Sequence, residues 1–272
     1  MQQAILLAGF GVLDKTQRTA CLDLLAAEIA AAFPGCIVRQ AYTSAFIRRR
    51  LAAAGDPMDG LSEALQKLHQ EGIRRVFVQP LHLTSGEEYE EKLVKPVLQL
   101  QADFADLQLG QPLLPACAEA LQTFDFARLL QALTDEAAPK DGEVLVFMGH
   151  GSPHRHNPAY ELLQTAADQL GLPLHIGVLE ETDTPSLQDV LQRLQQHRIQ
   201  KILLRPLLLT SGSHVTEDMA GPAPSSWKNQ LEQAGFCVRV DPRGLASYPA
   251  FRQLYRQKIA HSLKECAMQK QD

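Results

Sequence analysis

The chain has 272 residues, of which 45% are hydrophobic and 21% are charged, and its formal net charge is -5 at pH 7. This composition is typical of a folded globular protein, and the length allows one large domain or two modest ones. The negative charge, without any long basic block, argues against a nucleic-acid-binding protein.

Strands and helices alternate along the first half of the sequence. Short apolar runs at 5–10, 36–42 and 75–79 predict strands that are buried in a parallel sheet. Apolar residues at helical spacing predict four helices, at 16–33, 44–54, 61–70 and 87–100. This order is typical of βαβ units, in which helices cover both faces of the sheet.

The same order starts again in the second half. Strands are predicted at 143–148, 174–179 and 201–204, and helices at 158–170, 186–197 and 248–267. A polar loop with Pro and Gly, at 135–142, is the candidate linker. We therefore expect an N-terminal lobe, 1–134, and a C-terminal lobe, 143–272, whose last helix could pack back on the first lobe.

A sequence repeat supports this division. Segment 78–86 reads Val-Gln-Pro-Leu-His-Leu-Thr-Ser-Gly, and segment 204–212 reads Leu-Arg-Pro-Leu-Leu-Leu-Thr-Ser-Gly. In the same way, Gly-Phe-Gly at 9–11 corresponds to Gly-His-Gly at 149–151. The repeat predicts an α/β protein of two similar Rossmann-like lobes, each with a parallel sheet, and a ligand cleft between them.

Three polar residues follow predicted strands of the second half. His150 lies between two glycines after the first of these strands, Glu180 follows the second, and His214 follows the repeated Thr-Ser-Gly loop of the third. Because the carboxyl ends of parallel strands meet at one edge, these side chains can converge. Two imidazoles and a carboxylate suit divalent cobalt, nickel, iron or zinc, and three protein ligands leave a coordination position open. A single histidine would more often be structural, but three such groups favour a metal site.

Other polar residues allow a structural interpretation beside a functional one. His82 lies in the repeated segment and could face a ligand or be a core histidine. Glu87 and Glu88 open a helix, where carboxylates complement the helix dipole, but either could hold incoming metal. Neither a complete Gly-x-Gly-x-x-Gly fingerprint nor a phosphate-binding Gly-x-x-x-x-Gly-Lys-Ser/Thr loop is present, so no organic cofactor is expected.

The chain also shows no sign of a membrane or secreted protein. No apolar stretch has the length of a transmembrane helix, and the first residues lack a secretory signal. The five cysteines are scattered and include no Cys-x-x-Cys pair, which argues against disulfides, structural zinc and iron–sulfur clusters. We therefore expect a cytoplasmic protein.

The motifs around these residues resemble those of a known family, the anaerobic cobaltochelatases of cobalamin biosynthesis of the CbiK type. The resemblance covers essentially the whole chain and rests on segments Val146–Gly151, Gly177–Glu180, Leu207–His214, Pro80–Leu83 and Gly86–Lys92. It implies the chelatase fold, related to ferrochelatase, with a tetrapyrrole cleft between two lobes. One departure is Gly9, where relatives carry a serine before the Phe-Gly pair.

The resemblance implies an activity, the insertion of Co2+ into sirohydrochlorin with release of two protons. The metal-binding and catalytic residues of the family fall on His150, Glu180 and His214, of which Glu180 completes the metal site or acts as a base. Sirohydrochlorin is rich in carboxylates, which basic residues such as Arg48 could meet. The residues expected to contact the tetrapyrrole are Phe10, His82, Thr84, Ser85, Glu87, Thr210 and Ser211.

Two alternatives stay open. A nickel- or iron-inserting tetrapyrrole chelatase would use the same residues, since divalent metals follow one common order of affinity. A non-catalytic protein that binds metal or tetrapyrrole would need only the cleft. In every case the expected partners are a divalent metal and a tetrapyrrole such as sirohydrochlorin, and a homo-oligomer is left open.

Overall fold

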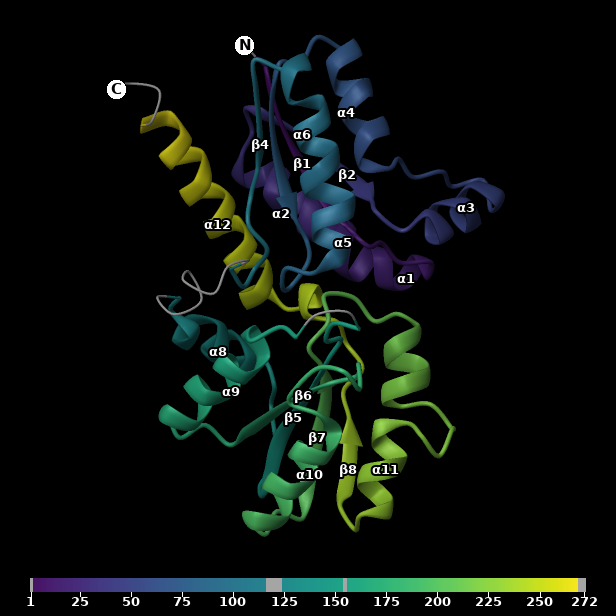
Figure 1. Ribbon diagram of the computed structural model, residues 1–272, viewed down its shortest axis with the longest axis vertical. Helices are drawn as coiled ribbons and strands as arrows, with labels where there is room; N and C mark the ends of the chain where they lie inside the picture. Colours follow the sequence, from purple (N-terminus) through teal and green to yellow (C-terminus); the bar gives the residue numbers. More distant parts are fainter. Residues whose placement is uncertain (1, 116–123, 154–155, 269–272) are drawn as a thin grey trace. The chain divides into compact units, whose positions relative to one another are not determined.

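A computed structural model describes residues 2–115, 124–153 and 156–268 of the chain (Figure 1). Contacts group the chain into two compact units. Unit 1 comprises Met1–Ala116 together with Arg252–Asp272, and unit 2 comprises Cys117–Phe251. Each unit holds one four-stranded parallel sheet, which confirms the predicted α/β class. Within the described residues, no helix is long and apolar enough to cross a membrane.

The sheet of unit 1 has the strand order β2-β1-β3-β4. Its strands are β1 (Gln3–Gly9), β2 (Cys36–Tyr42), β3 (Arg75–Pro80) and β4 (Asp106–Leu109). The helices are α1 (Lys15–Arg18), which continues through a π-helical turn at Thr19–Asp23 into α2 (Leu24–Ala32), then α3 (Ala45–Ala53), α4 (Leu61–Gln70), α5 (Glu87–Tyr89) and α6 (Lys95–Leu100). A second π-helical turn, Glu90–Val94, joins α5 to α6, and a 3-10 turn, Gln101–Asp103, follows α6.

The sheet of unit 2 has the matching order β6-β5-β7-β8. Its strands are β5 (Glu143–Gly149), β6 (Leu174–Val178), β7 (Lys201–Pro206) and β8 (Cys237–Val240). The helices of the unit are α8 (Phe126–Asp135), α9 (Ala159–Gln169), α10 (Leu187–Gln196) and α11 (Trp227–Gln233). A π-helical turn, His214–Met219, follows β7, and a 3-10 turn, Leu245–Ser247, precedes α12 (Pro249–Met268).

Burial on both faces explains why the central strands have continuous apolar sequences. Val144, Val146 and Met148 of β5 pack in one cluster with α10 and α11, and Leu145 and Phe147, which point to the other face, are also buried. Figure 1 shows α10 and α11 alongside this sheet. The residues that point to one face of the sheet and those that point to the other are therefore both apolar, as expected of a parallel strand with helices on both faces.

The two sheets repeat the same register at the carboxyl ends of their strands. Ala8 of β1 pairs with Pro80 of β3, and Met148 of β5 pairs with Pro206 of β7. The strand-to-loop exits also match, because Leu81 N donates to Ala8 O at 2.7 Å and Leu207 N donates to Met148 O at 2.8 Å. The predicted internal repeat is thus a structural repeat.

The grouping of α8 differs from the division expected from the sequence, which placed its residues in the lobe 1–134. Arg205 is almost fully buried on β7, its guanidinium lies 4.4 Å from the ring centre of Tyr248, and its Nη1 donates to Leu133 O of α8 at 3.3 Å. A buried arginine needs such acceptors. This contact, together with the packing of α8 on α9, groups α8 with unit 2.

The residues of α12 beyond Phe251 group with unit 1. Arg252 Nε lies 2.7 Å from Glu28 Oε1 of α2, and the side chain of Arg252 is only 7% exposed, whereas that of Glu28 is 37% exposed. The buried Tyr255 hydroxyl donates to Leu81 O at 3.4 Å.

One buried histidine of unit 2 gives the stability a pH dependence. Burial, with the positive charge of Arg193 nearby, lowers the pKa of His175 to about 4. Arg193 Nε donates to its Nδ1 at 3.2 Å, which favours the neutral ring. The unfolded chain binds this proton below about pH 6.5 and the folded chain does not, so stability is lost as the pH falls from about 6.5 towards 4.

We expect His175→Gln to flatten this pH dependence. Between pH 7 and pH 5 the wild-type chain should lose on the order of 2 kcal/mol more unfolding free energy than the variant. Urea unfolding at the two pH values measures this difference. Equal losses in His175→Gln and wild type would contradict the assignment.

Candidate metal site

His150 lies directly after β5, at the carboxyl edge of the unit 2 sheet. Backbone hydrogen bonds join the ends of neighbouring strands here, because Leu179 N donates to Gly149 O at 3.0 Å and Glu180 N donates to His150 O at 3.0 Å. These bonds place Glu180 beside His150, although the two residues are thirty positions apart in sequence. Both side chains stay accessible, with 41% of His150 and 29% of Glu180 exposed.

The two glycines that flank His150 are required by close packing. A Cβ atom on Gly149 would lie 2.6 Å from Cε1 of the buried Tyr160. Gly151 has a positive φ of +83°, and a Cβ there would lie 3.0 Å from Val178 Cβ and 3.1 Å from Glu180 Cβ. Only glycine adopts this backbone without strain and leaves room for both neighbours.

The side chains of His150, Glu180 and His214 come together at this edge. The rings of His150 and His214 meet edge to face, with centroids 4.8 Å apart, and His150 Nε2 lies 3.9 Å from Glu180 Oε1. Two atoms bound to one ion, each at about 2.1 Å, are separated by at most about 4.2 Å. The His150–Glu180 separation therefore falls within the span of a shared ion.

Hydrogen bonds at the Nδ1 atoms leave both Nε2 atoms free to face a metal. His150 Nδ1 lies 3.1 Å from Gly151 O, which accepts only if this nitrogen carries the proton. His214 Nδ1 lies 2.8 Å from Asp218 Oδ2, one helical turn along the chain. A carbonyl or carboxylate on the far nitrogen of a ligating imidazole fixes its tautomer and raises its basicity.

The three donors are close but not yet arranged as a finished coordination shell. Among the residues that the structure describes, no group of three or more His, Cys, Asp or Glu side chains surrounds one point at ligand distances. Side-chain rotation about His150, Glu180 and His214 is needed to close the set. All three side chains are partly exposed, so such rotations meet little steric hindrance.

A further carboxylate supports the loops that carry these residues, and sequence reasoning missed it. Asp183 is buried between the loops after β5 and β6, where it accepts hydrogen bonds from the backbone N–H groups of Ser152, Asn157 and Thr184. The only sequence signal is an Asp before Thr-Pro in a loop, which is common in turns.

Comparison with known proteins decides the family. The sequence model of one family, described as cobalt chelatase (CbiK), matches residues 3–264. The chain belongs to the CbiK family. A sirohydrochlorin cobaltochelatase CbiKC of Nitratidesulfovibrio vulgaris is 39% identical over 253 residues, 92% of this chain and 86% of the relative. The sirohydrochlorin cobaltochelatase of Salmonella typhimurium is 32% identical over 265 residues, 96% of this chain and 95% of the relative.

Solved structures show the same fold at lower sequence identity. SirB from Bacillus subtilis, in a structure with Fe3+, aligns with a TM-score of 0.58 at 14% identity and covers 96% of this chain and 95% of its own. CbiX, described as the terminal enzyme for siroheme biosynthesis in denitrifying bacteria, aligns with a TM-score of 0.54 at 21% identity, covering 95% and 98%. These likenesses confirm the chelatase fold.

The repeat explains why this CbiK chain has its histidine pair in unit 2 only. In unit 1, Ser44 N donates to Phe10 O at 3.3 Å, which matches the bond from Glu180 N to His150 O. Phe10 and Ser44 therefore occupy the places of His150 and Glu180. The aligned repeat puts Glu88 at the place of His214, and Glu88 accepts a hydrogen bond from Thr43 Oγ1. The unit 1 counterpart thus offers one carboxylate and no imidazole.

The predicted tetrapyrrole contacts of unit 1 lie at or just after the carboxyl ends of β1 and β3. Phe10 is 54% exposed, so its ring is accessible to a ligand, although single exposed apolar side chains are common on protein surfaces. Gly9 precedes it, and a Cβ there would lie 2.9 Å from Leu81 Cβ, so this packing disfavours any side chain at position 9. Thr84 and Ser85 are partly exposed.

His82 and Glu87 are placed differently. Both ring nitrogens of His82 are buried without a hydrogen-bond partner among the described residues, and burial lowers its pKa to about 4. His82 is therefore neutral near pH 7, with its ring edge-on to Tyr89. Glu87 is exposed at the start of α5.

The predicted contacts of unit 2 lie on the loop after β7. Thr210 is partly exposed and Ser211 only 6% exposed. The backbone of the loop packs tightly against Gly244, where a Cβ would lie 2.6 Å from Leu209 O. Of these two hydroxyls, that of Thr210 is the more accessible to a ligand.

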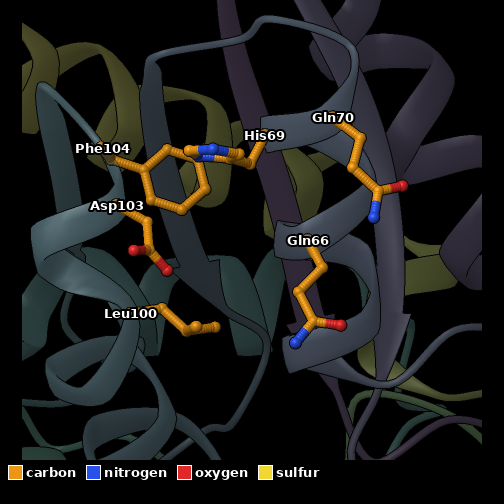
Figure 2. Close-up of a pocket in the computed structure, with 6 residues that line it drawn as sticks. All are labelled: Gln66, His69, Gln70, Leu100, Asp103 and Phe104. Carbon is orange, nitrogen blue, oxygen red and sulfur yellow. The ribbon is translucent and has the colours of Figure 1, made fainter.

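The small pockets of unit 1 do not coincide with the predicted metal residues. A pocket of about 100 Å³, lined by His69, Phe104 and four neighbours, lies beside the amino ends of β3 and β4 (Figure 2). Ligand pockets usually have about 300 to 1,000 Å³. A second pocket, of about 160 Å³, is lined in part by Thr43, Arg48 and Lys92, but Arg48 is held by Glu63, with Nη1 3.0 Å from Oε2.

Proposed function

We propose that this chain is a sirohydrochlorin cobaltochelatase that inserts Co2+ into the macrocycle at the carboxyl edge of the unit 2 sheet. Membership of the cobalt chelatase family and the names of the two relatives support the reaction. The observation that supports the site is the closeness of His150 to both Glu180 and His214, which belong to the connections after β5, β6 and β7.

The reaction exchanges two pyrrole protons for one divalent ion, so no redox cofactor is required. His150 and His214 ligate Co2+ through Nε2 as neutral imidazoles, and Glu180 supplies an oxygen that replaces part of the water shell. As the ion leaves for the macrocycle, the freed imidazoles and carboxylate are proton acceptors near the pyrrole nitrogens. Their exposure to water lets these protons pass on to solvent.

Recognition of the macrocycle divides between apolar and polar contacts. Phe10 offers an exposed aromatic face to a flat ring, and His82, Thr84, Ser85, Glu87, Thr210 and Ser211 are the polar contacts we propose.

A spectroscopic assay tests the function directly. Purified protein is mixed with sirohydrochlorin and Co2+, and the visible absorption of the macrocycle is followed against a reaction without protein. We expect protein-dependent conversion to the cobalt complex, faster than with Ni2+ or Fe2+ and absent with protoporphyrin. Faster conversion with Ni2+ or Fe2+ would assign another metal. Tight binding of the macrocycle without conversion would identify a non-catalytic binding protein.

A further inference from the structure

Asp183 is the most deeply buried carboxylate near the candidate metal site. Its side chain is 0% exposed, and it lies in the connection between β6 and α10, three residues after Glu180. Burying a carboxylate is costly unless hydrogen bonds replace its water shell. A carboxylate is nevertheless buried here, so its hydrogen bonds must fix the position of the backbone around it.

Four donors from the described residues surround this carboxylate, and three of them come from the backbone. Oδ2 accepts from Ser152 N at 2.9 Å, and Oδ1 accepts from Asn157 N at 3.1 Å and from Thr184 N at 2.9 Å. The fourth is the His156 ring, whose Nδ1 lies 2.8 Å from Oδ1. Backbone N–H groups cannot change into acceptors, so this pocket requires a group that only accepts hydrogen bonds.

These bonds join the two loops that carry the proposed ligands. Ser152 is two residues after His150 on the connection from β5 to α9, and Asp183 follows Glu180 on the connection from β6 to α10. Thr182 adds a second cross-link, since its hydroxyl lies 3.2 Å from Ser152 O. The distance between His150 and Glu180 therefore depends on Asp183 and Thr182 as well as on the strand ends.

We propose that Asp183 is a positioning residue of the metal site, which holds the His150 loop and the Glu180 loop at the separation that one ion requires. The inference depends on the metal site of the proposed function, but it concerns binding of the ion and not its transfer. Asp183 touches neither metal nor macrocycle, and its effect passes through the backbone of Ser152 and Glu180.

The test compares Asp183→Asn with Asp189→Asn. Asp183→Asn would turn an NH2 group towards backbone donors. Asp189 is the control, because it caps the start of α10, where its Oδ2 accepts from Ser186 N at 2.7 Å. Both changes should lower the melting temperature. Only Asp183→Asn should weaken Co2+ binding, by about tenfold to a hundredfold.

Co2+ alone is titrated into each purified protein below its melting temperature, and the visible d–d absorption of the bound ion reports affinity and geometry. Thr182→Val, a milder change, should weaken binding by a smaller factor and keeps the test valid if Asp183→Asn does not fold. Wild-type affinity in Thr182→Val and in folded Asp183→Asn would overturn the proposal, as would equal weakening in Asp189→Asn. A wild-type chain that binds Co2+ but leaves sirohydrochlorin unchanged would contradict the proposed function alone.

Discussion

Replacing His150 or His214 by alanine is expected to reduce the rate of Co2+ insertion by about 10²- to 10⁴-fold while the chain stays folded. Each change removes one proposed metal ligand, which is also a proton acceptor once the metal leaves. The His150 and His214 rings are in contact, so the remaining histidine cannot replace the lost ligand without changing its own position.

The stability of both variants should stay near that of the wild type. The His150 and His214 side chains are 41% and 43% exposed, so their loss leaves no sealed cavity. Surface changes of this kind usually alter the unfolding free energy by about 0.5 kcal/mol or less. A loss of activity with an unchanged melting temperature would thus come from the site and not from the fold.

His197 provides the matched control, because it is an exposed histidine of the same unit that follows α10. The rate of insertion is measured for all three alanine variants from the absorption of the macrocycle at saturating sirohydrochlorin. His197→Ala should keep wild-type turnover. Near-wild-type turnover in either of the other two variants would remove that histidine from the proposed site.

The sequence was most informative where strands are central and apolar. β1, β3, β5 and β7 are central in their sheets and were predicted from continuous apolar runs, and the edge strands β2 and β6 were predicted from shorter apolar runs. β4 and β8 were missed because each has only four residues, among which charged or polar side chains interrupt the apolar ones. α11 was missed as well, since its seven residues are too few to show a helical period.

The site was predictable to the extent that topology alone determines it. His150, Glu180 and His214 each follow a strand of one parallel sheet, and such strands end at the same edge. Asp183 was not predictable, because its partners are backbone N–H groups that every residue except proline carries. α8 was not predicted either, although its buried Leu129, Leu130 and Leu133 have the spacing of a helix.

Gly151→Ala is expected to lower the rate of Co2+ insertion by about 10²-fold, because a misplacement of about 1 Å at a reacting group has an effect of this size. The added methyl group would lie 3.1 Å from Glu180 Cβ and 3.0 Å from Val178 Cβ. It would therefore push Glu180 away from His150, whose ring hydrogen-bonds to the carbonyl of this same glycine.

The effect of backbone strain must be distinguished from the effect of displacing Glu180, and Gly171 provides the control. Gly171 also has a positive φ, +65°, but a Cβ there would meet nothing within 4 Å. Alanine at either position should reduce the unfolding free energy by about 1 to 2 kcal/mol, the cost of a left-handed conformation in an L-residue. Urea unfolding measures this shared term.

Only Gly151→Ala should then lose Co2+ affinity and turnover, since only its methyl group reaches a proposed ligand. If Gly171→Ala lost as much activity as Gly151→Ala, the effect would come from general destabilisation of unit 2. If Gly151→Ala kept its activity despite the strain, Glu180 would not need its observed place beside His150. The glycine after the histidine would then serve the turn and not the metal.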